Sequence, residues 1–323
     1  MNTRITRSPA VAAKFIGDGL VVAFPTETVY GLGADALNPD AVKRIFKAKG
    51  RPADNPLIVH MGDISMLERV AKSIPRRAES LMTSFFPGPL TLVLPRHPNV
   101  PLEVTAGLDT VGVRFPAHPV ASAFLKACCV PVAAPSANRS GRPSPTTWGA
   151  VDDEMNGRIS CILKGGPSEV GLESTVVDCT GGQLIILRQG AVSLEMLRAV
   201  APKIRVSDRL EAQEPARSPG LKYRHYAPRV RVVLVDHPTS IEAKPGERFA
   251  YIGLTAKGLR RKPVLSKSCR GVPAYARSVF AFFRACEQSG ATVIYAQRVE
   301  ASGLGRALMD RLQRAADDHP KVH

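Results

Sequence analysis

The sequence has few of the features that mark secreted, membrane or zinc-binding proteins. Its six cysteines, at positions 128, 129, 161, 179, 269 and 286, form no C-x-x-C pair and no zinc-site spacing. We therefore expect reduced thiols and no disulfide framework. No apolar run approaches the length that spans a bilayer, and the first nine residues lack the apolar core of a signal peptide. These absences predict a cytoplasmic protein with no membrane partner.

Aromatic and acidic residues are also scarce. A single tryptophan and an aromatic content of 6% give little support to a stacking platform for single-stranded nucleic acid. The 28 Asp and Glu residues are outnumbered by 44 Lys and Arg residues, which leaves a formal net charge of +16. This surplus favours polyanionic partners, either nucleotides or nucleic acid. The sequence shows no carboxylate cluster, so we expect no metal site made by the protein alone.

The most distinctive stretch is Lys47–His60, where cations precede an apolar run. Lys47, Lys49 and Arg51 occupy alternate positions, and Gly50 and Pro52 are expected to interrupt the preceding helix. If the chain turns extended here, the three cations point to one side and can clamp phosphate oxygens. The apolar run then reads as a buried strand that ends at His60. A solvated basic loop before a core strand has the same pattern, and these residues alone leave both interpretations open.

Polar, glycine-rich loops follow other predicted strands. Pro25–Gly33 comes directly after the apolar run Leu20–Phe24, and its hydroxyls and glycines suit close approach of a ligand to the backbone. Gly31–Ala36 also fits the dinucleotide-binding pattern G-x-G-x-x-G/A. Its glycines begin well past the end of the strand, which argues against a dinucleotide site.

Further candidate residues lie at predicted strand ends. Thr110 and Arg114 fall on the same face of one predicted strand. The same sequence would also fit an Arg114 that is only a surface charge at the end of the strand. Ser136 and Asn138 end an apolar strand, where they could also serve only as a turn and a cap. The loop Ser140–Thr146 adds hydroxyls and a cation, a composition suited to phosphate oxygens.

The chain length and the succession of predicted strands and helices indicate an α/β protein of two domains. We expect an N-terminal domain at 1–210, a linker at 211–229 and a smaller α/β domain at 230–323. Within the linker, Ser218–Pro228 is too aromatic and basic for a passive spacer. We expect it to close as a lid over the ligand, with aromatic residues that merely join the two domains as the alternative.

Five motifs occur in an order that resembles the Sua5/YrdC family. They span residues 25–33, 47–60, 134–138, 171–178 and 218–228. The resemblance covers essentially the whole chain, and the last motif with its α/β tail is similar to the longer, Sua5 branch. It implies a YrdC-like twisted α/β domain with a basic concave pocket, followed by a smaller, Rossmann-like Sua5 domain. Phe85–Pro89 and Met309–Arg311 depart from the family's pattern but touch none of the five motifs.

The resemblance implies the activity of an L-threonylcarbamoyladenylate synthase, a nucleotidyltransferase. Such an enzyme joins L-threonine, bicarbonate and ATP into threonylcarbamoyl-AMP and releases pyrophosphate. The product would pass to the tRNA threonylcarbamoyl transferase machinery, for threonylcarbamoyladenosine formation next to the anticodon. Weak binding of tRNA itself is a further expectation. Mg²⁺ would be bound through the ATP phosphates, with no protein metal site.

The family pattern also implies two sets of binding residues. Threonine is expected to contact Thr28, His60, Arg114, Ala134 and Ser174. ATP is expected to contact Arg51, Asn55, Thr110, Ser136, Ser144, Arg188 and Tyr226. Catalytic roles are expected for Lys49, Arg51, Ser136 and Asn138.

The chemistry of this reaction agrees with the residue types. Threonine must be carboxylated on nitrogen, and the carboxylate of the resulting labile carbamate must then attack the α-phosphorus. No protein residue need become covalent, so the site must supply positioning, charge neutralisation and exclusion of water. Arg114 would pair with the threonine carboxylate, while Lys49, Arg51 and Arg188 would pair with the triphosphate.

Two other functions remain open at this point. A non-enzymatic RNA-binding protein could use the same basic face, and it would show a steep salt dependence and no nucleotide turnover. A transferase that uses carbamoyl phosphate could contain a related domain. It would normally also carry cysteine-rich metal modules, which this sequence lacks.

Overall fold

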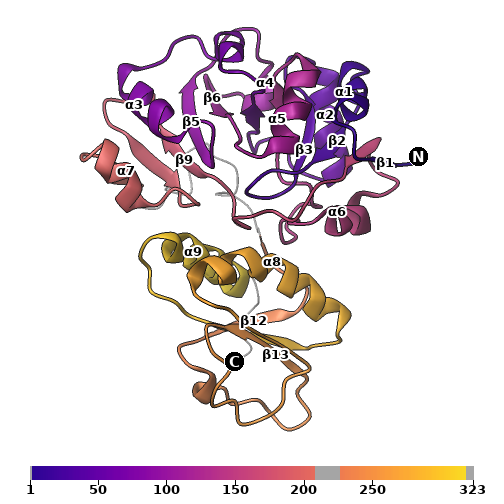
Figure 1. The fold of residues 1–323 in the computed structure, drawn as a ribbon, viewed down its shortest axis with the longest axis vertical. Coiled ribbons are helices and arrows are strands. Elements are labelled where there is room, and N and C mark those ends of the chain that lie inside the picture. Colours follow the sequence, from indigo (N-terminus) through magenta and orange to yellow (C-terminus); the bar gives the residue numbers. More distant parts are fainter. Residues whose placement is uncertain (1, 208–225, 318–323) are drawn as a thin grey trace.

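The computed structural model describes residues 2–207 and 226–317, which form two sheets with separate hydrophobic cores. We call residues 2–207 the N-terminal domain and residues 226–317 the C-terminal domain (Figure 1). The predicted α/β class is confirmed. The expected linker at 211–229 and the lid at Ser218–Pro228 lie outside the described residues up to position 225, so the boundary and the lid stay predictions.

The N-terminal domain alternates strands with mostly short helices. Its elements are β1 (Arg4–Thr6), α1 (Pro9–Gly17), β2 (Val22–Phe24), β3 (Gly31–Asp35), α2 (Pro39–Lys49), β4 (Ile58–His60), the 3-10 helix η1 (Ile64–Arg69), α3 (Arg76–Phe85), β5 (Leu90–Pro95), α4 (Leu102–Thr105), β6 (Thr110–Arg114), α5 (Pro119–Cys128), β7 (Val132–Ala133), α6 (Trp148–Met155), β8 (Cys161–Leu163), β9 (Thr175–Asp178), β10 (Ile185–Arg188), α7 (Leu194–Val200) and β11 (Arg205–Val206).

The C-terminal domain is smaller. Its elements are β12 (Arg231–Val235), the 3-10 helix η2 (Pro238–Ser240), β13 (Phe249–Gly253), β14 (Leu265–Ser268), α8 (Val272–Gln288), β15 (Val293–Gln297) and α9 (Leu304–Asp317). The four strands are all parallel, in the order β12-β15-β13-β14. The expectation of an α/β domain in this part of the chain is met, and β14 is a strand of mostly exposed residues.

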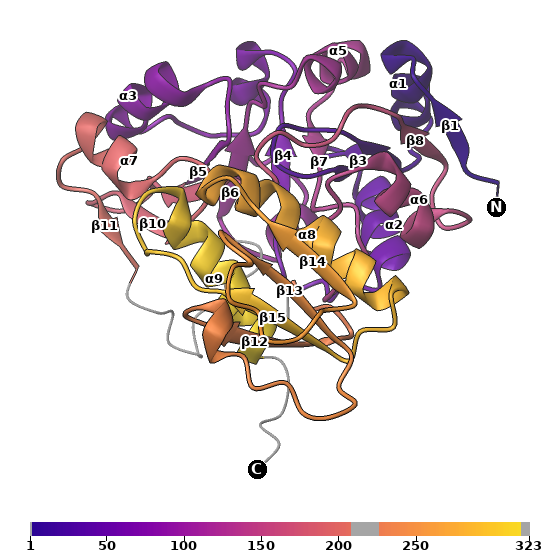
Figure 2. The same ribbon diagram turned by 60° about the horizontal axis from the view of Figure 1, so that its bottom comes forward.

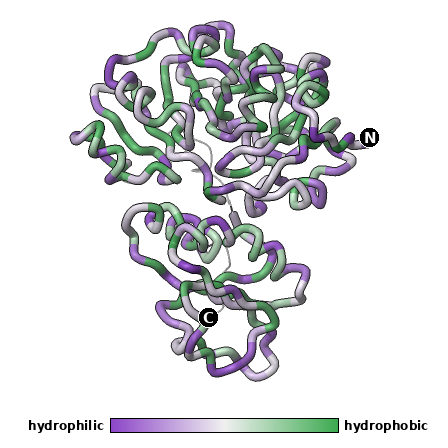
Figure 3. The backbone as a smooth tube through the Cα atoms, in the orientation of Figure 1, coloured by the Kyte–Doolittle hydropathy of each residue, from purple (hydrophilic) through white to green (hydrophobic). Residues whose placement is uncertain are grey.

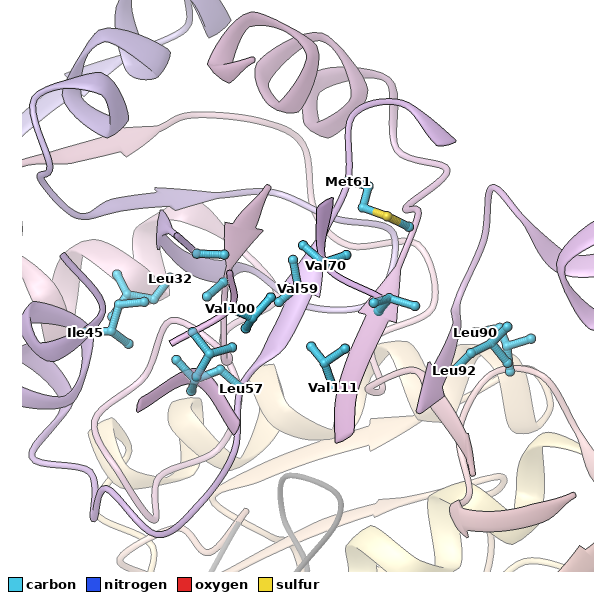
Figure 4. Packing of buried hydrophobic residues seen from close by; sticks show 14 of the residues in the cluster. Leu32, Ile45, Leu57, Val59, Met61, Val70, Leu90, Leu92, Val100 and Val111 are labelled. Atoms are coloured by element: carbon cyan, nitrogen blue, oxygen red, sulfur yellow. The ribbon is translucent and has the colours of Figure 1, made fainter. Parts of the chain in front are cut away.

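The N-terminal sheet has eleven strands in the order β1-β8-β2-β3-β7-β4-β6-β5-β9-β10-β11, with parallel and antiparallel pairs mixed. At its centre β4 and β6 run parallel, and residues of alternating chemistry divide between two faces. Val59, Val111 and Val113 point into the core, as Figure 4 shows for the first two. The intervening residues face the opposite side. This alternation brings His60 and Arg114, which are register partners, to one face.

Helix α2 determines the directions of the side chains in the first part of the basic stretch. It begins after Asn38, whose side chain accepts hydrogen bonds from the first-turn amides, and it continues through Lys49 until Gly50 takes a left-handed conformation (φ 60°). Because the chain is still helical at Lys47 and Lys49, residues two apart point in different directions. Lys47 is exposed and Lys49 is buried. The expectation that all three cations share one side is therefore wrong for Lys47.

The two domains meet through helices α8 and α9. These helices cover the face of the small sheet that looks toward the N-terminal domain (Figures 1 and 2). Val29 and Leu172 of the N-terminal domain belong to the same buried cluster as Tyr226 and Phe280. Gly171 lies so close to α8 that an added Cβ would stand 2.4 Å from Arg277 Cα. The packing between the domains is thus continuous with the core of the C-terminal domain.

Short hydrophobic and hydrophilic stretches alternate along the chain in both domains (Figure 3). In the part of the chain that the structure describes, no helix is long and apolar enough to cross a membrane.

Candidate active site

A cavity of about 700 Å³ opens where the loops after several N-terminal strands approach the C-terminal domain. All but two of the predicted site residues line it. The residues that do so are Thr28, Lys49, Arg51, His60, Arg114, Ala134, Ser136, Asn138, Ser144, Ser174, Arg188 and Tyr226.

The structure does not bring the other two residues, Asn55 and Thr110, to the wall of this cavity. Thr110 begins β6 and lines a separate small cavity, which shares Ile58 with the main one. It lies on the same strand face as Arg114, as expected, but four residues away, roughly 13 Å along a strand. Asn55 is buried, and its Oδ1 has no hydrogen-bond partner among the described residues.

Arg114 is held by a buried acid that the motif reading did not select. Its NH2 lies 2.9 Å from Glu27 Oε1, and its NH1 donates to Thr28 Oγ1 at 2.8 Å. Burial pushes the pKa of Glu27 upward, but the charge and hydrogen bonds of Arg114 outweigh it and hold that pKa below its ordinary value. Arg114 therefore reaches the cavity with a fixed orientation and a partly balanced charge.

His60 lies beside Arg114 as a neutral imidazole. Burial, reinforced by the Arg114 charge, lowers the pKa of His60 to about 3. Its Nδ1 lies 3.2 Å from the carbonyl oxygen of Ile58, and the ring meets Phe24 edge-on. At neutral pH this side chain can offer shape and a hydrogen bond but no charge.

Lys49 reaches the cavity from the last turn of α2. Its ammonium donates to the carbonyl oxygens of Ser136, at 2.6 Å, and of Asn138. Burial, and secondarily the charge of Arg51, holds the pKa of Lys49 well below its usual range. Ser136 Oγ in turn donates to Asn138 Oδ1 at 2.5 Å. The lysine thus ties the loop after β7 to the end of the helix.

Arg51 and Arg188 supply two further buried cations. Arg51 donates to the carbonyl oxygens of Asn55 and Pro56 through NH2, at 3.2 and 3.1 Å. Arg188, at the end of β10, donates to the carbonyl oxygen of Ser174 at 3.0 Å and to its Oγ at 3.2 Å. Burial is the main reason why the pKa of Arg188 is lowered. In these contacts, backbone carbonyl oxygens hold both guanidinium groups in place.

Another part of the cavity wall combines residues of both domains. Glu173 Oε1 accepts a hydrogen bond of 2.5 Å from Ser144 Oγ, and Glu173 Oε2 lies 2.8 Å from Nε of Arg311 on α9. Tyr226 stacks on Phe280, with ring centroids 5.6 Å apart, and the Arg311 guanidinium lies 4.9 Å from its ring centroid. Sequence reasoning missed Glu173 and Arg311. Glu173 sits inside a recognised motif, but nothing in the pattern of α9 singled out Arg311.

Taken together, four buried cations converge on one cavity, which the less buried Arg142 also lines. Lys49, Arg51, Arg114 and Arg188 are each less than a tenth exposed. Such an arrangement suits a ligand with several anionic groups that is shielded from water. Among the described residues no group of three or more His, Cys, Asp or Glu side chains could hold a metal ion.

Two family models match the chain and together cover most of it. Residues 14–190 match the Sua5/YciO/YrdC family, described as "Telomere recombination". Residues 192–317 match the Sua5 C-terminal family, described as the threonylcarbamoyl-AMP synthase C-terminal domain. The chain belongs to the Sua5 family. Both parts of this two-domain family are present, in the order that the motifs predicted.

Named relatives of the Sua5 family span nearly the same length. A threonylcarbamoyl-AMP synthase of Pyrococcus abyssi is 45% identical over 95% of this chain and 93% of the relative. One of Bacillus subtilis is 42% identical over 95% of this chain and 92% of the relative. A crystal structure of P. abyssi Sua5 complexed with L-threonine superposes with a TM-score of 0.89 and 41% identity, covering 98% of this chain and 97% of that one.

Proposed function

We propose that this protein is an L-threonylcarbamoyladenylate synthase, which converts L-threonine, bicarbonate and ATP into threonylcarbamoyl-AMP, pyrophosphate and water. The observation that carries the proposal is the convergence of four buried cations with the hydroxyls of Thr28, Ser136, Ser144 and Ser174 on one cavity. The names of the P. abyssi and B. subtilis relatives support it, as does the threonine complex of the P. abyssi protein.

Threonine would occupy the part of the cavity around Arg114, Thr28 and His60. The guanidinium of Arg114 would pair with the amino-acid carboxylate, and Glu27 would keep that guanidinium oriented. His60 would stay neutral, so it would not repel the threonine ammonium or compete for its carboxylate. The amino group must lose a proton before it attacks carbon dioxide or bicarbonate. Ala134 and Ser174 line the same cavity and would shape this subsite.

ATP would occupy the part lined by Arg51, Arg188, Ser136, Ser144 and Tyr226. The two arginines, with Lys49, would neutralise the triphosphate while the carbamate carboxylate attacks the α-phosphorus in line. The bond from the α-phosphorus to the bridging oxygen then breaks, and pyrophosphate leaves. This chemistry makes the protein a nucleotidyltransferase, and it requires no covalent protein intermediate.

Mg²⁺ fits this site as an ion carried by the ATP phosphates. Glu173 is the one carboxylate among the described lining residues, and both of its oxygens already bind Ser144 and Arg311. The phosphates and water would therefore supply the ligands. When bound, Mg²⁺ adds positive charge at the departing pyrophosphate. A nucleotide role for Thr110, which lines the neighbouring small cavity, and for Asn55, which lines neither cavity, stays a prediction.

The product defines the remaining partners that we propose. Threonylcarbamoyl-AMP is a mixed anhydride, so it must pass to a transferase that modifies tRNA next to the anticodon. The +16 charge would favour weak contact with tRNA itself. A reaction that consumes ATP suits the cytoplasm, and the six cysteines are free thiols in the structure.

Incubation with ATP, L-threonine and labelled bicarbonate tests the proposal directly. We expect a labelled adenylate with the mass of threonylcarbamoyl-AMP, and pyrophosphate release that stops when any one substrate is left out. Pyrophosphate release that ignores threonine would contradict the proposal. Binding of tRNA with a steep salt dependence but no adenylate would favour the RNA-binding alternative.

A further inference from the structure

Arg311 is a large side chain that the fold buries almost completely at the junction of the two domains. It is 1% exposed and extends from α9 of the C-terminal domain. Its Nε lies 2.8 Å from Glu173 Oε2, and its NH2 donates to the carbonyl oxygen of Gln189 at 3.0 Å. Its NH1 binds Asp310, the preceding residue on the helix. A buried charge is stable only when its donors are satisfied in this way.

The acid that Arg311 binds is part of the cavity wall. Glu173 lines the cavity, and its second oxygen accepts the hydroxyl of Ser144 at 2.5 Å. Ser144 is also buried and lines the cavity. A continuous chain of contacts therefore runs from α9 through Glu173 to Ser144.

The same guanidinium supports a second wall residue. The Arg311 guanidinium lies 4.9 Å from the ring centroid of Tyr226, and the Phe280 ring stacks on the same tyrosine. Both supports belong to the C-terminal domain. Tyr226 also has a positive φ of 71°, a conformation that a non-glycine residue holds only when its surroundings enforce it.

We propose that Arg311 is a positioning residue for the nucleotide part of the active site, through which the C-terminal domain orients Glu173, Ser144 and Tyr226. This inference rests on the proposed function, because that function assigns Ser144, Arg188 and Tyr226 to ATP. Arg311 itself is not among the residues that line the cavity, so it acts through its neighbours.

Charge balance explains why this position requires an arginine. Glu173 would otherwise present an unpaired carboxylate to the phosphates of ATP. It would also compete with those phosphates for Arg188, which lies close enough to feel the charges of both Glu173 and Arg311. Arg311 pairs with Glu173 without itself lining the cavity, so the charge of this carboxylate is balanced by a residue outside the cavity wall. Its planar fork satisfies Glu173 and Gln189 at once, which a lysine cannot do with one point charge.

The variant Arg311→Met tests the proposal in the full-length protein, with Arg306→Met as the matched control. Arg306 lies on the same helix and also pairs across the domains, with Glu195, but neither residue lines the cavity. Dissociation constants for ATP with Mg²⁺ and for L-threonine are measured by calorimetry, alongside KM and kcat. We expect Arg311→Met to raise the ATP constant about tenfold and to leave the threonine constant almost unchanged. Arg306→Met should leave both unchanged.

A double variant keeps the test valid if Arg311→Met does not fold. Glu173→Gln with Arg311→Met removes both charges of the buried pair, so no uncompensated charge remains. A positioning role predicts that the double variant folds and still binds ATP weakly, because Ser144 loses its carboxylate acceptor. Normal ATP affinity in the double variant would overturn the proposal, as would equal losses for ATP and threonine in Arg311→Met. If the wild-type protein makes no adenylate, the proposed function itself fails before the variants are compared.

Discussion

The two parts of the active site use the same kind of ion pair in opposite orientations. In the part proposed for threonine, Arg114 lines the cavity and pairs with Glu27. In the part proposed for the nucleotide, Glu173 lines the cavity and pairs with Arg311. The first pair lies within the N-terminal domain, whereas the second joins the two domains. The C-terminal domain therefore contributes a charged partner to the second pair only.

Under the proposed function, this difference would let one cavity receive two anions. Arg114 would present a cation to a single carboxylate. Arg51 and Arg188 would take a triphosphate, and the charge of Glu173 in the same cavity is balanced by Arg311, which does not line it. The four changes below test whether the two parts behave separately.

Arg114→Met should have the largest effect. It leaves the Glu27 carboxylate buried without its cation, so we expect a loss of roughly 3–5 kcal/mol in the free energy of unfolding. Threonine should bind far more weakly, while ATP affinity should change little because the two parts share no ion pair. Urea unfolding and calorimetry measure these effects. Adding Glu27→Gln should recover stability but not threonine binding, and an unchanged threonine KM in Arg114→Met would contradict the assigned role.

Arg51→Ala tests the nucleotide part. It removes a charge-assisted contact from a buried site, so we expect a loss of roughly 2–4 kcal/mol in transition-state stabilisation, seen as slower pyrophosphate release at saturating substrates. Threonine affinity should stay near the wild-type value. Near-normal turnover at saturating ATP would show that Arg51 only holds the carbonyls of Asn55 and Pro56.

Gly190→Ala tests how strictly the wall of the nucleotide part is packed. An added Cβ would stand 2.3 Å from the Thr175 nitrogen and 2.5 Å from the Glu173 carbonyl oxygen. We expect a cost of about 1–3 kcal/mol in the free energy of unfolding and a larger loss of ATP affinity than of threonine affinity. Gly182→Ala is the matched control, because an added Cβ there meets no atom within 4 Å. Equal behaviour of the two variants would contradict the close packing.

His60 should produce the smallest effect, visible only in acid. Its pKa of about 3 in the folded protein lies below that of the unfolded chain, near 6.5, so the unfolded state takes up the proton first. The neutral, buried His60 therefore makes its full contribution to stability above about pH 6.5. This contribution is lost as the pH falls toward 3, and the loss reaches about 1.4 kcal/mol by pH 5.5. Urea unfolding of the wild type and His60→Gln at pH 7.5 and 5.5 measures the difference. An equal loss in both proteins would show that the imidazole is not buried as neutral.

Much of the site was predictable because its residues belong to short motifs next to strands. Apolar runs such as the one ending at His60 form buried strands, and polar residues that follow them collect at neighbouring loops. The predictions were weaker where they depended on the direction in which a side chain points. Lys47 looked equivalent to Lys49 and Arg51, but a continuing helix turned it outward. Thr110 shares a strand face with Arg114 but lines a different cavity.

By itself, the sequence determined the α/β class and the loops after buried strands, because apolar periodicity and turn residues act over a few neighbouring positions. The resemblance of its motifs to the Sua5/YrdC family supplied most of the cavity residues. Only the tertiary structure decided that His60 lies beside Arg114, that Glu27 balances Arg114, and that Arg311 of the last helix pairs with Glu173. These outcomes depend on strand register and on the docking of two domains. Both join residues far apart in the chain, where buried charges must find partners that no local pattern names.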